Sequence, residues 1–410
     1  MSTDRNEEAR RAAAAASLAQ RKQQIRRNKQ KKRRRLRRFI LLGLILALIM
    51  ILIIACSVHS RNASENSERT DVPEPTADAA AENQEETGDS DASNGLSGGG
   101  DSIVIGLKGS AVQLVLAGEP YIENGAFAID KRSGAIPEDS IRISSNVDTS
   151  APGNYTVKYS VRNDGQKAET ERTVRVLSEE EFGDKASNVP VMMYHWVYTA
   201  EDVPENLDGN WILDTTLEEH LAFLSENGFY YPGWKELRAW IDDEISLPAK
   251  CTVLTFDDGK EAFLKYGVPL LERYRIPATS FMIGWEKNKG AEKIMKYASP
   301  YIDYESHTYA MHQKSVPAVS GHKGIMASMS IEDIKADLAR AAELTGSNDA
   351  IAYPYGDYTD DMLEAVRQQG ISCAFTVEYD RVRKGMDPAK LPRIRVLGDE
   401  SFQIWKDSVY

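Results

Sequence analysis

The sequence predicts a mainly parallel α/β domain, preceded by a small all-β sandwich and by a single transmembrane helix. Three observations lead to this fold class. Short apolar runs alternate with helical patterns after residue 178, β-branched runs separated by turn residues fill residues 102–177, and residues 39–58 carry no charge. With 410 residues, 42% of them hydrophobic, the chain is long enough for two or three domains with a sizeable core.

The N-terminal region predicts a membrane anchor. Residues 1–38 form a basic tail, with fifteen Lys and Arg residues against three acidic ones, that runs directly into the apolar segment 39–58. Such a segment is about long enough to span a bilayer core, and dense positive charge keeps its flank in the cytoplasm. We therefore expect a single-pass protein of the cell membrane with a cytoplasmic N-terminus, an extracellular C-terminal domain and no nucleic-acid partner. Two alternatives stay open: a cleaved signal peptide, which the long tail disfavours, and lipidation of Cys56.

Residues 59–101 are rich in Ser, Glu, Asp, Asn, Ala and Gly and predict an acidic, disordered linker. Residues 102–177 then predict a small β-sandwich, in which two long alternating strands flank a turn at "NDG". The stretch "VDTSAPGNYTVKYSV" within it resembles the bacterial immunoglobulin-like modules of cell-surface enzymes. Because the segment contains no catalytic constellation, we expect a spacer or a wall-binding module.

The C-terminal domain, residues 188–410, alternates strands with helices and predicts a barrel or a wound sheet. In such folds the chemistry gathers at the carboxyl ends of the strands. The only other cysteines, Cys251 and Cys373, lie in apolar runs and predict buried free thiols. The predicted strands are "VPVMMYH", "CTVLTF", "ATSFMIG", "YIDYESH", "AIAYPYG" and "ISCAFTV", and the helices are "LEEHLAFLSENG", "AFLKYGVPLLERY", "IEDIKADLARAAELTG" and "DDMLEAVRQQG".

Two of these strand ends predict a metal site. Asp257 and Asp258 are adjacent where "VLTF" stops, so repulsion and desolvation call for a positive partner. His307 and His312 are five residues apart, a spacing that suits a strand running into a loop better than one helix face. A solvated "DDG" turn and unrelated surface histidines are the alternatives. Together, one carboxylate and two imidazoles suit a catalytic zinc or similar divalent ion.

Four stretches in this order, "VPVMMYHWV", "LTFDDG", "SHTYAMH" and "AYPYGDY", resemble the motifs of the polysaccharide deacetylases of the NodB-homology group, carbohydrate esterase family 4. The resemblance covers residues 188–410 and implies a deformed (β/α) barrel. It implies that Asp257 is the catalytic base and that Asp258, His307 and His312 hold the metal, zinc with nickel or cobalt as alternatives. The histidine spacing is similar to that of the branch that deacetylates poly-N-acetylglucosamine.

The last of the four stretches, "AYPYGDY", implies the rest of the site. By resemblance, Pro354, Tyr355 and Gly356 contact substrate, and the main-chain N–H of Tyr355 stabilises the oxyanion. In the family, the motif that corresponds to this stretch usually begins with an Arg that braces the base, but Ala352 stands in that place here. Arg393 in "LPRIRV" is the candidate replacement.

Histidine and aromatic residues near the motifs complete the candidates. The family's late histidine, its general acid, is absent because no histidine follows His322. His195 is the predicted substitute, with a structural histidine as the alternative. Tyr309 is a predicted substrate contact. Trp196, Trp211 and Tyr358 are further candidates for stacking on sugar rings, and ordinary packing is at least as expected for each of the four.

These residues predict a metal-dependent hydrolase. It would remove N-acetyl groups from N-acetylglucosamine units of a cell-wall or biofilm polysaccharide, either peptidoglycan or poly-N-acetylglucosamine. Two other functions are open: an O-acetyl esterase on an acetylated glycan, and a catalytically weak protein that only binds glycan. A mere binder has no need of both Asp257 and Asp258, which favours the enzyme.

Overall fold

The structure is a computed structural model that describes residues 102–315, 319 and 321–410. The predicted basic tail, the apolar segment 39–58 and the linker 59–101 lie outside the described residues. Within those residues, no helix has both the length and the apolar character that a bilayer crossing requires.

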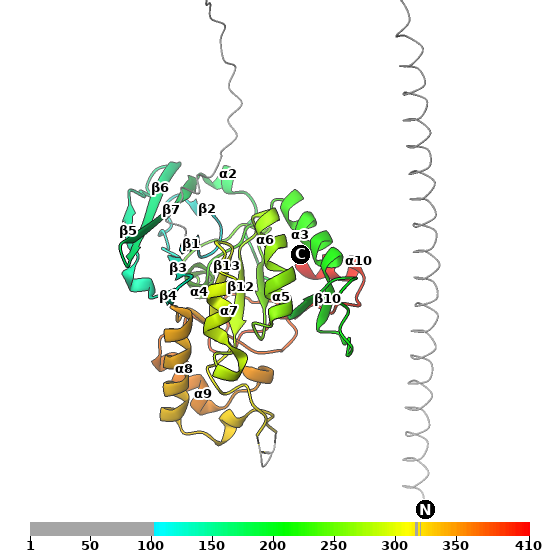
Figure 1. Cartoon of the computed structure of the whole chain (residues 1–410). Coiled ribbons are helices and arrows are strands. Elements are labelled where there is room, and N and C mark those ends of the chain that lie inside the picture. Colours follow the sequence, from blue (N-terminus) through cyan, green and yellow to red (C-terminus); the bar gives the residue numbers. More distant parts are fainter. Residues whose placement is uncertain (1–101, 316–318, 320) are drawn as a thin grey trace, which may run out of the picture. The chain divides into compact units, whose positions relative to one another are not determined.

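The N-terminal module of the described region is a β-sandwich of two sheets, as predicted (Figure 1). Apolar side chains from both sheets, among them Ile105, Ala128, Val157 and Val174, are buried in one core. Strand pairs are antiparallel except β2 with β7. The first sheet has the order β1 (Ile103–Leu107), β3 (Ala126–Asp130), β4 (Gly134–Ile136), and the second β2 (Val112–Leu116), β7 (Gln166–Leu177), β6 (Gly153–Asn163), β5 (Arg142–Ser145).

The long hairpin of this module turns at the predicted "NDG". Asp164 and Gly165, with φ of 44° and 75°, form the two central residues between β6 and β7. Positive φ at both positions is the geometry of the tight hairpin turn whose twist matches that of the strands. The turn residues therefore set the register of this strand pair, from Asn163 opposite Gln166 onwards.

The C-terminal domain is built on a sheet of parallel strands in the order β15-β14-β13-β12-β11-β8-β16. All six predicted strands are present, and the short edge strand β16 was not predicted. A separate parallel pair, β9 (Trp196–Tyr198) with β10 (Trp211–Leu213), was also not predicted. The strands of the large sheet are β8 (Val191–Tyr194), β11 (Val253–Phe256), β12 (Ala278–Met282), β13 (Ile302–Ser306), β14 (Ala350–Ala352), β15 (Cys373–Phe375) and β16 (Ile394–Arg395). Cys251 and Cys373 are buried free thiols, as predicted.

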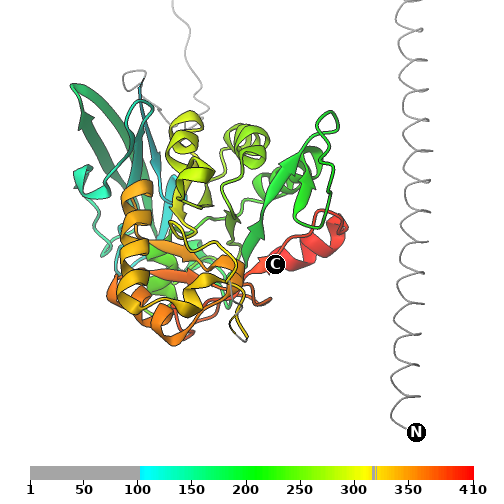
Figure 2. The same ribbon diagram turned by 60° about the horizontal axis from the view of Figure 1, so that its bottom comes forward.

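Helices pack around this sheet, with α8 and α9 beside its β13–β15 half and α10 against α3 (Figures 1 and 2). The predicted helix at "AFLKYGVPLLERY" is broken at Gly267, because Pro269 has no N–H to continue the hydrogen-bond ladder. As predicted, α8 ends at a glycine, Gly346, with φ of 73°. The helices are α2 (Glu179–Phe182), α3 (Asp214–Glu226), α4 (Trp234–Ile241), α5 (Glu261–Tyr266), α6 (Val268–Tyr274), α7 (Gly290–Lys296), α8 (Ile331–Thr345), α9 (Asp360–Gln368) and α10 (Phe402–Val409), with 3-10 turns at Glu138–Ser140, Glu286–Asn288, Ile325–Ser328 and Pro354–Gly356.

A buried lysine joins the β module to the α/β domain. Lys108 follows β1, and its Nζ lies 2.7 Å from Glu138 Oε2 in the module. The same Nζ lies 2.5 Å from Asp349 Oδ2 and 3.7 Å from Glu305 Oε1 in the α/β domain. The side chain of Lys108 is 1% exposed, and these carboxylates hold its pKa well above the ordinary value, although burial opposes the charge. The module therefore supplies a cation that the core of the other domain needs.

A second buried contact strengthens this junction. The side chain of Asn124 donates to Glu236 Oε2 at 2.9 Å and accepts from the Glu236 N–H at 3.0 Å. Glu236 lies in α4, and both side chains are buried. Ser110 and Tyr231 add a main-chain hydrogen bond across the junction. The β module and the α/β domain are therefore joined by buried polar contacts as well as by the connecting chain.

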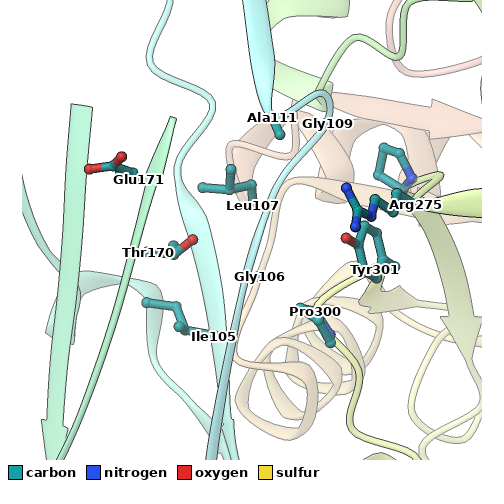
Figure 3. A pocket seen from close by; sticks show the side chains of 11 residues that line it. Ile105, Gly106, Leu107, Gly109, Ala111, Thr170, Glu171, Arg275, Pro300 and Tyr301 are labelled. Atoms are coloured by element: carbon teal, nitrogen blue, oxygen red, sulfur yellow. The ribbon is translucent and has the colours of Figure 1, made fainter. Parts of the chain in front are cut away.

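A small cavity of about 70 Å³ lies at the same junction (Figure 3). In Figure 3, Ile105 and Leu107 of the module line it opposite Arg275, Pro300 and Tyr301 of the α/β domain. None of the predicted catalytic or metal-binding residues lines it. The cavity is therefore separate from the site that the sequence predicts.

Replacement of Lys108 tests the junction. We expect Lys108→Met to lower the free energy of unfolding by about 3–5 kcal/mol, because it leaves buried carboxylates without their cation. Urea denaturation of the variant and the parent chain measures this difference. The matched control is Lys167→Met, which removes an exposed ion pair with Glu169 in the same module and should leave the midpoint near that of the parent. Equal midpoints for the two variants would contradict the assigned role of Lys108.

Candidate functional site

Three predicted ligand residues meet at the carboxyl edge of the sheet. Asp258 follows β11, and His307 and His312 follow β13. Asp258 Oδ1 lies 3.5 Å from Nε2 of His307 and 3.4 Å from Nε2 of His312, and one ligand atom from each residue lies within 4.8 Å of the others. Ligands that are about 2.1 Å from a tetrahedral zinc ion lie roughly 3.4 Å apart. The donor set and its spacing therefore fit a divalent cation.

Hydrogen bonds orient these ligands. His307 Nδ1 lies 2.7 Å from the carbonyl oxygen of Ala352 and donates to it, which turns Nε2 toward Asp258. Burial and the neighbouring His307 lower the pKa of His312 to about 4, so His312 is neutral, as a metal ligand must be. Burial opposes the charge of Asp258, but the contact with His307 outweighs it and keeps the pKa of Asp258 below its ordinary value.

The backbone explains the five-residue spacing of the histidines. Thr308 has φ of 68°, which turns the chain sharply after His307. The next two N–H groups, of Tyr309 and Ala310, donate to the two carboxylate oxygens of Asp337 at 2.7 and 2.8 Å. Asp337 lies in α8, so this helix fixes the loop that returns His312 to the site. The sequence analysis missed Asp337, which looks like any acidic residue of an amphipathic helix.

Asp257 forms a buried ion pair with Arg393. The guanidinium Nη1 and Nη2 lie 2.7 Å from Oδ1 and Oδ2 of Asp257, and neither residue is more than 3% exposed. Arg393 also donates to the Thr255 hydroxyl and to the Thr376 carbonyl, so the guanidinium is well satisfied. Burial alone would raise the pKa of Asp257, but Arg393 holds it below the ordinary value. Arg393 thus occupies the position that was predicted for it beside the candidate base.

His195 is buried directly after β8, next to Trp196. Its Nδ1 has no hydrogen-bond partner among the described residues. Burial lowers the pKa of His195, against the opposing charges of Asp257 and Asp258. The structure therefore brings His195 near the two carboxylates, and its role as general acid stays a prediction.

Tyr355 lies in a strained turn beside the ligands. It has φ of 61°, and its ring centroid lies 4.6 Å from that of His312. Gly356 has φ of 70°, and a Cβ there would lie 2.3 Å from a methyl carbon of Val377. Glycine is therefore required at this position, and the turn after Pro354 is held in one shape.

The aromatic candidates have different surroundings. Trp196 and Trp211 pack edge to face with ring centroids 5.0 Å apart, and the indole N–H of Trp196 also donates to Asp258, one of the candidate metal ligands. The ring of Tyr309 instead lies 3.9 Å from the guanidinium carbon of Arg340 in α8. Tyr358 packs against Tyr353 at 5.8 Å. Packing contacts thus account for part of the surface of each ring, and ordinary packing was the alternative to stacking on sugar rings.

Comparison with known proteins finds two matching families. Residues 244–374 match the family described as polysaccharide deacetylase, and residues 105–176 match the bacterial surface protein Ig-like domain. Poly-beta-1,6-N-acetyl-D-glucosamine N-deacetylases of Staphylococcus aureus (strain MRSA252) and Staphylococcus epidermidis are each 29% identical, over 167 and 163 residues. These matches cover 38% and 37% of this chain and 57% and 56% of the relatives. The chain thus spans just over half the length of the curated relatives that it matches.

Solved structures also resemble part of the chain. The Streptococcus pyogenes deacetylase PplD, in complex with acetate, matches with 20% identity and a TM-score of 0.45, over 54% of this chain and 98% of that protein. IcaB from Ammonifex degensii matches with 23% identity and a TM-score of 0.43, over 55% and 97%.

Replacement of Arg393 tests the buried pair. We expect Arg393→Met to lower the free energy of unfolding by about 3–5 kcal/mol, because the buried charge of Asp257 loses its partner. Chemical denaturation measures the loss. Arg395→Met is the matched control two residues further along, where an exposed guanidinium contacts Asn210. A loss at Arg393 no larger than that at Arg395 would show that the pair contributes little.

Proposed function

We propose that this chain hydrolyses N-acetyl groups of N-acetylglucosamine units in a bacterial surface polysaccharide, because residues 244–374 match the polysaccharide deacetylase family. The observation that carries the proposal is the pairing of Asp257 with Arg393 next to the cluster of Asp258, His307 and His312. The names of the curated relatives favour a β-1,6-linked N-acetylglucosamine polymer as the first substrate to test.

Asp258, His307 and His312 would hold a divalent cation, with zinc as the first candidate and nickel or cobalt as alternatives. When bound, such an ion polarises a carbonyl oxygen and makes a water molecule more acidic. The chain's own ligands are already oriented for this, because Ala352 fixes the tautomer of His307 and burial keeps His312 neutral.

Asp257 is the proposed base that takes a proton from the attacking water. A carboxylate has about four lone-pair sites, and Arg393 uses two of them, so each oxygen keeps one for the water. The guanidinium keeps Asp257 ionised and stops its rotation, at the cost of some basicity. The pair therefore favours correct orientation of the base over high proton affinity.

The remaining roles concern the tetrahedral intermediate and its collapse. Negative charge develops on the former acetyl oxygen, and the main-chain N–H of Tyr355 is the proposed donor to it. The departing amine needs a proton, for which His195 is the candidate donor. Both residues follow strands that end at the same edge of the sheet, β14 and β8, which supports a shared substrate position.

Acetate release tests this function. We expect release from β-1,6-linked N-acetylglucosamine oligomers that stops when the metal is chelated and returns when zinc is restored. Asp257→Asn should reduce the rate by about 10²–10⁴-fold, because it removes the base. Asp361→Asn, at an exposed position of α9, is the matched control and should leave the rate unchanged.

The same assay separates the alternatives. Peptidoglycan and an O-acetylated glycan are run beside the oligomers, and the fastest substrate identifies the polymer and the bond. Release from the O-acetylated glycan alone would replace the proposal with an esterase. Metal binding without acetate from any substrate would leave a glycan-binding protein.

We also propose that residues 39–58 anchor the protein in the cell membrane with residues 102–410 outside. The support is the basic tail before an uncharged apolar segment, together with the match of residues 105–176 to a domain of bacterial surface proteins. Protease added to intact cells should then digest the C-terminal domain and spare the tail. Protection of the whole chain would contradict this orientation.

A further inference from the structure

The two carboxylate oxygens of Asp258 have different neighbours, and the indole of Trp196 contacts only one of them. Its Nε1–H donates to Oδ2 at 2.9 Å, while Oδ1 faces the imidazoles of His307 and His312. We propose that Trp196 is a positioning residue of the metal centre, which occupies Oδ2 so that Asp258 presents Oδ1 alone to a divalent cation. This inference rests on the metal site of the proposed function and adds the group that sets how its carboxylate binds.

Three neighbouring groups hold the ring of Trp196 in place. It begins β9 and pairs in parallel register with Trp211 at the start of β10, and the two rings meet at 66° with centroids 5.0 Å apart. Lys260, two residues after Asp258, places its Nζ 3.5 Å from the Trp196 centroid and 4.6 Å from the Trp211 centroid. A strand pair, a second indole and an ammonium group therefore hold the Trp196 ring in one orientation.

The ammonium group of Lys260 also affects the indole N–H of Trp196 as a hydrogen-bond donor. A cation over the face of an indole attracts its π electrons, which draws electron density from the ring and makes the N–H a stronger donor. The acceptor is a carboxylate, so the bond is charge-assisted. Because Lys260 occupies one face of Trp196, that face is not open to a sugar ring, which weakens the expectation that Trp196 is a stacking platform.

Removal of the N–H should change how Asp258 binds a metal. Its side chain is only 18% exposed, so little water replaces a lost partner at Oδ2. The freed carboxylate can then rotate, and either bring both oxygens toward the cation or turn Oδ1 away from the histidines. Loss of a hydrogen bond that orients a metal ligand typically costs 10–100-fold in metal affinity.

The test compares Trp196→Phe with Trp211→Phe in the full chain. Phenylalanine keeps an aromatic ring at each position, and only the first change removes the bond to Asp258. Metal is removed from each protein, zinc affinity is measured by competition with a coloured chelator, and the absorption spectrum of the cobalt form reports the ligand geometry. We expect Trp196→Phe to bind zinc 10–100-fold more weakly with an altered cobalt spectrum, and Trp211→Phe to stay within about twofold of the parent.

Two outcomes would overturn the inference, and they are distinguishable. Equal zinc affinity and identical cobalt spectra for Trp196→Phe and the parent would show that Trp196 only packs. A parent chain that binds neither ion would overturn the proposed metal-dependent function as well.

A second readout serves if Trp196→Phe does not fold. The parent chain has six tryptophans, and ¹⁵N labelling makes each indole N–H visible by NMR. An indole N–H bonded to a metal-binding carboxylate should shift when zinc is added. We expect one of the six signals to move and to exchange slowly with solvent, and no movement of any signal would overturn the inference.

Discussion

Charge balance along one face of β13 is the constraint on which both ends of the α/β domain depend. Side chains alternate along a strand, so Asp303 and Glu305 share a face of β13, and His307 follows directly after the strand; all three are buried. At the amino end, Lys108 from the β module supplies the positive charge. At the carboxyl end, His307 faces Asp258. Burial penalises these charges, so Lys108 near Glu305 and the contact of His307 with Asp258 meet the same requirement at opposite ends of one strand.

The two adjacent aspartates differ because their partners differ. Asp257 is fixed by a permanent cation, the guanidinium of Arg393, and stays close to one geometry. Asp258 instead contacts two imidazoles through Oδ1 and one indole through Oδ2, and none of these groups is a permanent cation. A shared backbone turn with φ of 73° at Asp258 separates the two side chains. The different environments of the two neighbouring carboxylates thus come from residues that lie far apart in the sequence and that the fold brings to them.

Local pattern was sufficient to predict the strands and the candidate residues at their ends, because apolar runs that end in Asp or His can be read in the sequence itself. Residues whose role depends on distant partners were not visible. Asp337 reads as one of several helix acids, and Lys108 reads as a surface lysine in a loop, yet both are buried against groups more than 20 residues away. Arg393 was proposed only because Ala352 stands where the family usually has an arginine. The two-residue strand β16 has too few residues to show any period.

The paired contacts of Asn124 and Lys108 bear on how such a protein can be recombined. Surface proteins are often regarded as chains of interchangeable modules, joined by linkers that tolerate exchange. Here the first module contributes side chains to the interior of its neighbour, where Asn124 donates to Glu236 and Lys108 pairs with Asp349. A sandwich taken from another surface protein would fit this position only if it brought an amide and an ammonium group at the same two loop positions. The unit that can be moved between proteins is therefore residues 102–410 as a whole.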